Sequence, residues 1–293
     1  MKQFLRCLCG TMMALLLLLT LPAAAEGFTP LPLEAEAGPV VPKENYSADG
    51  MSYKDESISI RIEEFREYDT TILAAYIDIV DPSQIRTAMA HRYGSKRTAI
   101  GRVLSKRSNA VLAVNGDFFS FHNEGYLVRQ GVLYRDRTNA TYDILIIDDK
   151  GDFHIIVDPT EEAAHGFEGN IVNSFNFGPA LVIDGEIITT TKEMTVGLYK
   201  PTQRMGIAQL GPLSYLCIAT EGPENKGSVG FTIQQMADLC LEKGCINAYN
   251  LDGGSSSTIV LNNRKINSLS AGKVRPVGDC IYFATLVPDT KEE

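Results

Sequence analysis

The sequence predicts an α+β domain built from mixed β-sheets with few helices. Strand-like patterns outnumber helix-like patterns by roughly three to one along the chain. The two kinds of pattern do not alternate strictly, which disfavours a sheet assembled from βαβ units. No internal repeat is present. We therefore expect one catalytic domain over residues 53–293, preceded by a signal peptide and a linker.

The N-terminal region has the layout of a secretory signal. Lys2 and Arg6 precede an apolar run at 12–21, and three alanines end at Ala25. This order predicts cleavage after Ala25 and a secreted or extracytoplasmic protein. The apolar run is shorter than the ~20 residues of a membrane span, although an uncleaved N-terminal anchor is a second interpretation. Residues 26–52 are rich in Pro, Glu, Ala and Gly without periodicity, which predicts a flexible linker.

The charge balance is acidic. The chain has 27 basic and 36 acidic residues, and residues 1–25 hold two of the basic and none of the acidic ones, so the remainder carries a net charge of −11. Such acidity argues against nucleic acid or an anionic membrane as a partner. An anionic substrate would need a few well-placed arginines.

The first half of the domain is expected to begin with a hairpin. Residues 57–67 alternate apolar and polar positions, and 71–80 is a second β-rich run. Residues 97–107 place four apolar side chains on one helical face. The apolar run at 110–114 is typical of a buried strand.

Further strands and one longer helix are expected after residue 120. The expected strand regions are 126–134, 142–157 with a turn at 148–151, 173–188 with a turn at 184–185, 213–220 and 280–287. Residues 231–243 have helical spacing, with Thr232 as N-cap and Gly244 as the C-terminal stop.

Four of the six cysteines lie beyond the signal region, namely Cys217, Cys240, Cys245 and Cys280. Two disulfides are conceivable in an exported protein, and three pairings exist. All four cysteines also fit apolar strand or helix patterns, so buried free thiols explain them nearly as well. Their spacing does not match a zinc site.

Two polar turns lie beside apolar strands. One of them follows the helix pattern at 231–243 and precedes the apolar run at 259–261. The sequence NLDGGSSST at 250–258 brings two glycines, a carboxylate and three serine hydroxyls into one turn, which suits a polyhydroxylated or anionic ligand. The sequence NGDFF at 115–119 ends the buried strand at 110–114. Each turn alone is explained equally well by backbone capping and core packing.

Together these motifs resemble the phosphodiester glycosidase family. NGDFF at 115–119, Gly178-Pro179, RMGIAQ at 204–209, the loop at 250–258 and RPV at 275–277 occur in the family's order, covering about residues 109–286. The sequence departs from the family pattern at three positions, Ala208, Glu221 and Ser255. These departures affect loop geometry and substrate choice and remove no charged group.

The resemblance implies hydrolysis of a sugar-1-phosphodiester at the anomeric carbon. The leaving phosphomonoester has a second pKa near ~6, so a strong general acid is less necessary than in ordinary glycosidases. Asp252 and Asp117 are the candidate carboxylates, and Arg204 is the candidate phosphate clamp. The expected substrate-binding residues are Asn115, Gly116, Asn250, Gly253, Gly254, Ser255, Ser256 and Arg275. For Arg275, a structural ion pair is an equally good interpretation.

Three other classes compete with this interpretation. A serine hydrolase is disfavoured because the serine-rich loop lacks the Gly-x-Ser-x-Gly elbow. A non-catalytic cell-wall polysaccharide-binding protein could use the same loop. Asp117 and Asp252 could also hold calcium, although no cofactor is required and the loop of an EF-hand is absent. The carbohydrate phosphodiester is thus the expected partner, and the sequence does not determine the oligomeric state.

Overall fold

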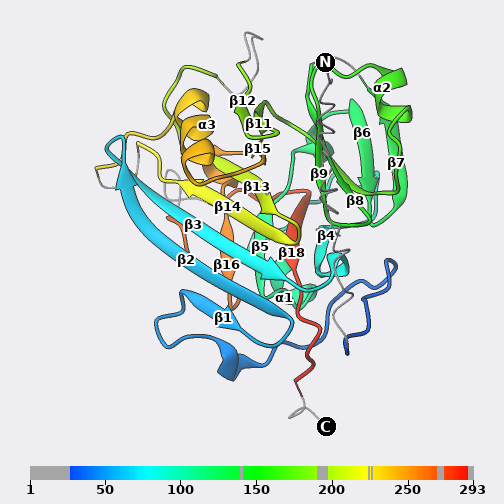
Figure 1. The fold of residues 1–293 in the computed structure, drawn as a ribbon, viewed down its shortest axis with the longest axis vertical. Helices are drawn as coiled ribbons and strands as arrows, with labels where there is room; N and C mark the ends of the chain where they lie inside the picture. The colour runs from blue at the N-terminus through cyan, green and yellow to red at the C-terminus, as the bar shows by residue number, and fades with distance from the viewer. Residues whose placement is uncertain are drawn as a thin grey trace, which may run out of the picture.

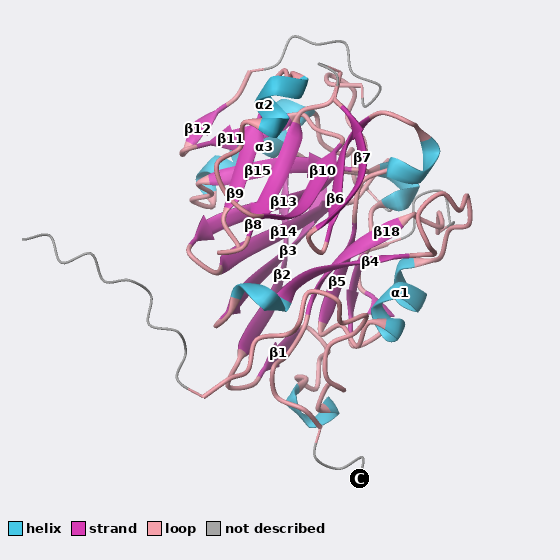
Figure 2. Cartoon of the chain, turned by 90° about the vertical axis from the view of Figure 1, so that its right-hand side faces the viewer, coloured by secondary structure: helices cyan, strands magenta, loops and turns pink. Residues whose placement is uncertain are grey.

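A computed structural model describes residues 27–138, 141–189, 197–223, 225, 227–268 and 274–289. The predicted signal peptide at 1–25 lies outside the described residues. Two large sheets stack face to face, and a helix covers the outer face of each (Figures 1 and 2). None of the described helices is long and apolar enough to cross a membrane.

The larger sheet has the order β1-β2-β3-β14-β13-β15-β11-β12. These strands are β1 (Ser52–Lys54), β2 (Ile58–Glu67), β3 (Thr70–Ile79), β11 (Ala180–Ile183), β12 (Glu186–Ile187), β13 (Met205–Gly211), β14 (Ser214–Thr220) and β15 (Asn247–Leu251). The expected hairpin forms through β2 and β3, with Ile58 opposite Ile79.

The second sheet has the order β17-β16-β5-β18-β4. Its strands are β4 (Ile85–Met89), β5 (Leu112–Asn115), β16 (Ile259–Leu261), β17 (Arg264–Lys265) and β18 (Asp279–Phe283). A three-stranded sheet and a hairpin lie beside it. They are formed by β6 (Gly125–Arg129), β7 (Val132–Arg137), β8 (Ile144–Asp148), β9 (Phe153–Ile156) and β10 (Ile171–Asn176).

The main core lies between the two large sheets. Ile77, Ile207 and Tyr249 of the larger sheet meet Val114 and Ile281 of the second, all almost fully buried. Removing apolar surface from water is the dominant favourable term in folding, so this layer holds the sheets together. The helix α3 (Ile233–Glu242) packs on the opposite face of the larger sheet, and α1 (Gly101–Arg107) packs on the outer face of the second.

The α+β class with few helices is confirmed, and the described strand pairs are antiparallel. Thr232 caps α3 through a capping box with Gln235, as its sequence predicts. Three expected boundaries were wrong. The region 126–134 is the hairpin β6–β7, turning at Gln130 and Gly131, which both have positive φ. The helix expected at 97–107 begins only at Gly101, because Ala99 forms a β-bridge with Val277. β18 ends at Phe283, four residues before the expected end.

Residues 27–52 lie against the domain, although the sequence predicts a linker there. The Leu31 N–H donates to Ser83 Oγ over 2.9 Å, and the Tyr46 hydroxyl donates to the Val111 carbonyl over 3.2 Å. The buried Arg86 donates through Nη2 to the carbonyls of Pro32 and Ala35, each at 2.8 Å. Composition missed this because the segment makes most of these contacts through its own backbone groups.

The four cysteines of the described residues are buried free thiols. Cys217 lies in the core between the sheets, and Cys280 lies under α1. Cys240 lies on α3 and Cys245 follows that helix, and the interaction with the Cys245 thiol, together with burial, raises the pKa of Cys240.

Candidate active site

The loop after β15 crosses from the larger sheet to the second sheet. It carries Asp252, continues through a short 3₁₀ turn at Gly254–Ser256 and enters β16. Gly253 packs so closely that a β-carbon there would lie 2.6 Å from the carbonyl oxygen of Gln203. The Gly254 N–H donates to the same oxygen over 2.8 Å, and Gly254 has φ +56°. Both glycines are therefore needed to hold the Asp252 loop against the start of β13.

Asn115 positions this loop. Its Nδ2 donates to the Asp252 carbonyl over 2.7 Å, and its Oδ1 accepts from the Thr258 N–H over 3.0 Å. The side chain is 1% exposed, so it joins both ends of the loop to β5. Gly116 leaves room for the Asp279 carboxylate, since a β-carbon there would lie 2.3 Å from Asp279 Oδ1.

The Asp117 carboxylate is buried and held by hydrogen bonds on both oxygens. Its Oδ1 accepts from the Phe119 N–H and from Arg129, and its Oδ2 accepts from the Asn176 N–H over 2.9 Å. Arg129 also pairs with Asp279 at 2.6 Å, and all three charged side chains are buried. Asp117, Arg129 and Asp279 thus form a buried charged trio. Within the described residues, no group of three or more His, Cys, Asp or Glu side chains is placed to hold a metal ion.

The Arg204 side chain donates to backbone carbonyls near the cavity beside Asp252. Its Nε donates to the Phe231 carbonyl over 3.0 Å, and its Nη2 donates to the carbonyls of Gly197 and Lys200. Burial lowers the pKa of Arg204 to about 10. The side chain therefore still carries its positive charge at neutral pH. These contacts fix the segment before β13 and hold Nε and Nη2 of Arg204 on backbone carbonyls.

Asp252 is the carboxylate of the loop after β15. Burial raises its pKa above the usual aspartate value, and the Asp117 charge adds to this effect. The nearby Ser256 hydroxyl and the Gly253 backbone oppose the rise in pKa, as does the positive charge of Arg275. Asp252 is therefore a partly desolvated carboxylate with a nearby cation.

A cavity of about 300 Å³ opens beside Asp252. It is lined by Phe118, Phe177, Thr202, Gln203, Arg204, Asp252, Gly253 and Gly254. Phe118 and Phe177 meet edge to face with their ring centroids 4.9 Å apart, so they form an apolar wall opposite the polar loop. Apolar walls with a few converging polar groups are typical of ligand sites, and this volume is at the lower end of their range.

The remaining predicted residues divide between scaffold and rim. Asn250 is buried, and its Nδ2 donates to the Gly178 carbonyl over 2.7 Å. The Ser255 carbonyl accepts from the Arg275 N–H, while the Arg275 side chain is exposed. Ser256 lies buried beneath Asp252. The structure thus brings Asp252, Gly253, Gly254 and Ser256 together, with Arg275 close enough to influence the Asp252 charge.

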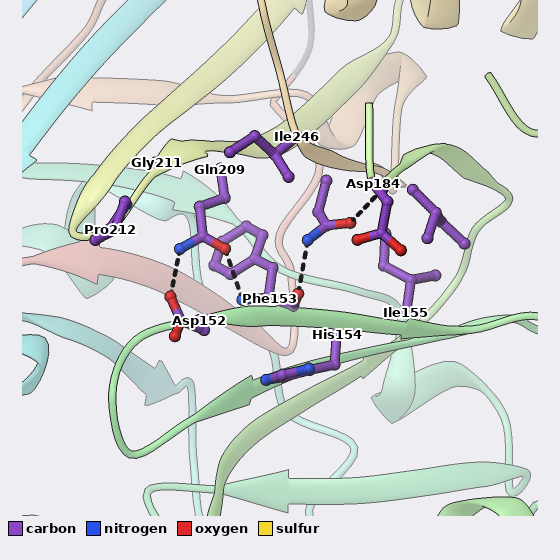
Figure 3. Close-up of a pocket in the computed structure, with 11 residues that line it drawn as sticks. Asp152, Phe153, His154, Ile155, Asp184, Gln209, Gly211, Pro212 and Ile246 are labelled. Carbon is purple, nitrogen blue, oxygen red and sulfur yellow. Dashed lines mark hydrogen bonds between the residues drawn. The ribbon is translucent and has the colours of Figure 1, made fainter. Parts of the chain in front are cut away.

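A second cavity, of about 460 Å³, lies near the other end of β13 and β15. There Gln209 donates to Asp152 over 2.7 Å and accepts from the Phe153 N–H over 2.9 Å (Figure 3). Asn247 is bonded in the same way, to the Phe153 carbonyl and the Asp184 N–H. The amide side chains that line this second cavity are therefore hydrogen-bonded within the protein, in contrast to the amide that lines the cavity beside Asp252.

Sequence reasoning did not select Gln203, Thr202 or the cavity-lining role of Phe118 and Phe177. The two aromatic residues adjoin recognised motifs, since Phe118 belongs to NGDFF and Phe177 precedes Gly178-Pro179. Gln203 precedes the motif that begins at Arg204, but a single glutamine carries no pattern that marks it.

Comparisons with known sequences agree with the motifs. A sequence model described as phosphodiester glycosidase matches residues 108–284. The SPbeta prophage-derived uncharacterized protein YomE of Bacillus subtilis (strain 168) is 30% identical over 192 residues. That match covers 64% of this chain and 30% of YomE, so the chain spans about a third of that relative's length.

Three solved structures share the fold. The catalytic domain of zebrafish N-acetylglucosamine-1-phosphodiester alpha-N-acetylglucosaminidase, auto-inhibited by its pro-peptide, has a TM-score of 0.65 at 16% identity. The likeness covers 89% of this chain and 99% of that domain. A hypothetical protein from Synechocystis has a TM-score of 0.53 at 15% identity, covering 78% of this chain and 62% of that one. A protein of Burkholderia pseudomallei K96243 that is inferred to be exported also has a TM-score of 0.53, at 14% identity, covering 73% of this chain and 74% of that one. At such identities these likenesses bear on the fold alone.

Proposed function

The chain belongs to the phosphodiester glycosidase family, and from that premise we propose that it hydrolyses the glycosidic C–O bond of a sugar-1-phosphodiester. The observation that carries the proposal is Asp252, a partly desolvated carboxylate on a glycine-rich loop beside a small cavity. A carboxylate in that position can stabilise an oxocarbenium-like centre or activate water.

The proposed reaction needs little acid assistance. Cleavage at the anomeric carbon releases a phosphomonoester, whose second pKa is near ~6, so the leaving group departs without a strong general acid. The Arg275 side chain is exposed at the rim, and its charge acts on Asp252. We assign Arg275 to the phosphate, because guanidinium pairs with phosphate oxygens through two parallel hydrogen bonds.

We also propose that the protein acts outside the cytoplasm, on glycans of the cell surface or the environment. The basic start, the apolar run at 12–21 and the alanines ending at Ala25 support export. Sequencing the N-terminus of secreted protein should give Glu26 as the first residue. Met1 retained on cytosolic protein would refute the proposed location.

The experiment that tests the activity uses the purified protein and a panel of hexose 1-(methyl phosphate) diesters. We expect release of free sugar and methyl phosphate from at least one diester, and no release by a folded Asp252→Asn variant. Binding of wall polysaccharide with no cleavage of any diester would instead support the non-catalytic polysaccharide-binding alternative.

A further inference from the structure

Gln203 lines the cavity beside Asp252, and the protein makes no hydrogen bond to its side-chain amide. It is 1% exposed, yet neither its amide oxygen nor its amide nitrogen has a hydrogen-bond partner in the structure. Its backbone, in contrast, is fixed. The Gln203 carbonyl accepts from the Gly254 N–H, and Gly253 packs directly against it. The residue is thus held at the Asp252 loop with a buried donor and acceptor unsatisfied.

Such an arrangement is costly in a free protein. A buried polar group without a partner loses its hydrogen bonds to water and gains none in return. Elsewhere the same fold satisfies its buried glutamines. Gln209 is bonded to Asp152 and Phe153 (Figure 3), and Gln84 to the backbone of residues 57, 80, 81 and 284. Among the buried glutamines of the described residues, Gln203 is thus the one whose amide has no hydrogen-bond partner.

We propose that Gln203 is a specificity-determining residue for the sugar. Its amide binds two neighbouring groups on the sugar ring, one that donates and one that accepts a hydrogen bond, such as two adjacent hydroxyls. This inference rests on the proposed function, and it deepens that function by naming what the cavity recognises. A primary amide offers one acceptor and one donor side by side, which matches a pair of neighbouring ring substituents. Phe118 and Phe177 supply the apolar wall for the C–H groups of the same ring.

The test separates binding from turnover. Hexose 1-C-phosphonates have a methylene group in place of the glycosidic oxygen, so they bind without being cleaved. Calorimetry would measure gluco, galacto, manno and 2-acetamido-gluco phosphonates, and then the monodeoxy analogues of the tightest ligand at carbons 2, 3 and 4. We expect wild-type protein to lose about tenfold or more in affinity when one of the two recognised groups is removed.

The variant Gln203→Met keeps the length of the side chain and removes its amide. It should bind the parent phosphonate about as weakly as wild-type protein binds the critical deoxy analogue, and removing that hydroxyl should cost it little more. Three results would overturn the inference, namely no binding of any phosphonate, unchanged binding by Gln203→Met, or an equal loss for every ligand.

A stability measurement with a matched control separates recognition from packing. Gln203→Met should leave Tm unchanged or raised, because it removes an amide that has no partner. Gln209→Met strips partners from Asp152 and Phe153, and should lower Tm by roughly 3–10 °C. If Gln203→Met lowers Tm as much as Gln209→Met does, the residue is structural. Phosphonate binding that depends on Gln203, without cleavage of any diester, would refute the proposed hydrolysis and leave this inference standing.

Discussion

Asp252 combines a raised pKa with a position beside the cavity, which gives its activity a pH signature. The carboxylate acts when ionised, so kcat/KM should fall as pH drops through its pKa, and this acid limb should lie above the ordinary aspartate value of ~3.9. Ser256→Ala removes the nearby hydroxyl that lowers this pKa, so the limb should move to higher pH. Profiles of kcat/KM against pH for both proteins test this. An active Ser256→Ala variant with an unmoved limb would show that Asp252 is not the group that titrates.

Arg204 now carries a prediction about stability. Arg204→Ala removes the hydrogen bonds to the carbonyls of Phe231, Gly197 and Lys200, and we expect a loss of about 1–3 kcal/mol in the free energy of unfolding. The exposed Arg275 is the matched control, because Arg275→Ala should change stability by less than ~0.5 kcal/mol while weakening turnover of phosphodiesters. Urea unfolding and kinetics of both variants decide between the roles. A fully stable Arg204→Ala protein that fails only on phosphodiesters would restore the clamp.

These residues show what sequence can and cannot reveal at this scale. Asp252 was found because two glycines and three serines around a carboxylate have a recognisable meaning. Arg204 and Asp117 belong to equally recognisable motifs, yet their roles depend on where their side chains point. Asp117 turns to Arg129 and Asn176, which lie 12 and 59 positions away, and no local pattern contains that information.

At the scale of elements, Arg129 connects parts of the chain that belong to three different sheets. It lies on β6, pairs with Asp279 on β18 and Asp117 after β5, and also donates to the Ser174 carbonyl on β10. Arg129→Met would leave two carboxylates buried without a cation. We expect the free energy of unfolding to fall by about 3–5 kcal/mol at neutral pH.

The pH dependence of this variant follows from the buried carboxylates. Burial already raises the pKa of Asp279, while Arg129 lowers it, so removing Arg129 raises that pKa further. A carboxyl whose pKa is higher in the folded than in the unfolded state loses stability as pH rises between the two values. The defect of Arg129→Met should therefore be smaller at pH 5 than at pH 7 in urea unfolding. Adding Asp279→Asn should recover part of the lost stability. An equal loss of stability at both pH values would show that the side chains of the buried trio do not carry these charges.

Element prediction succeeded where periodicity was clear and failed where it was not. The alternation of Ile58, Ile60 and Ile62 marked β2 correctly, because one face of that strand is buried. β13 and β15 were not identified, since both are buried on two faces and carry glycine or asparagine among apolar residues. β13 follows Gln203 and β15 precedes Asp252, so sequence recognised the Asp252 loop but missed the strands that position these two residues.

At the scale of the whole molecule, the candidate site depends on how the two sheets are joined. The loop from β15 to β16 spans them, and Asn115 on the second sheet holds that loop at both ends. Sequence could predict the class of fold, because strand patterns and their lack of alternation with helices are local. It could not predict the stacking order, since that order arises from side chains such as Tyr249 and Ile281 that meet from distant positions.

The segment at residues 27–52 gives the last prediction, because it lies outside the matched family region and yet contacts the domain. Arg86 donates to carbonyls of Pro32 and Ala35, and the Gly38 N–H donates to the Ser108 carbonyl over 3.0 Å. A protein beginning at residue 53 leaves the Arg86 guanidinium without these acceptors, which should cost about 1–3 kcal/mol relative to a protein beginning at residue 27.

Thermal and urea unfolding of the two lengths measure this cost, and Arg86→Met supplies the control. In the longer protein Arg86→Met should be destabilising, whereas in the shorter one it should be nearly neutral, because the acceptors are already gone. Such non-additivity would assign the stabilisation to the contact between Arg86 and the segment. Equal stability of the two lengths would instead return residues 27–52 to the role of a linker, with Arg86 satisfied through Tyr282 and Ser83 alone.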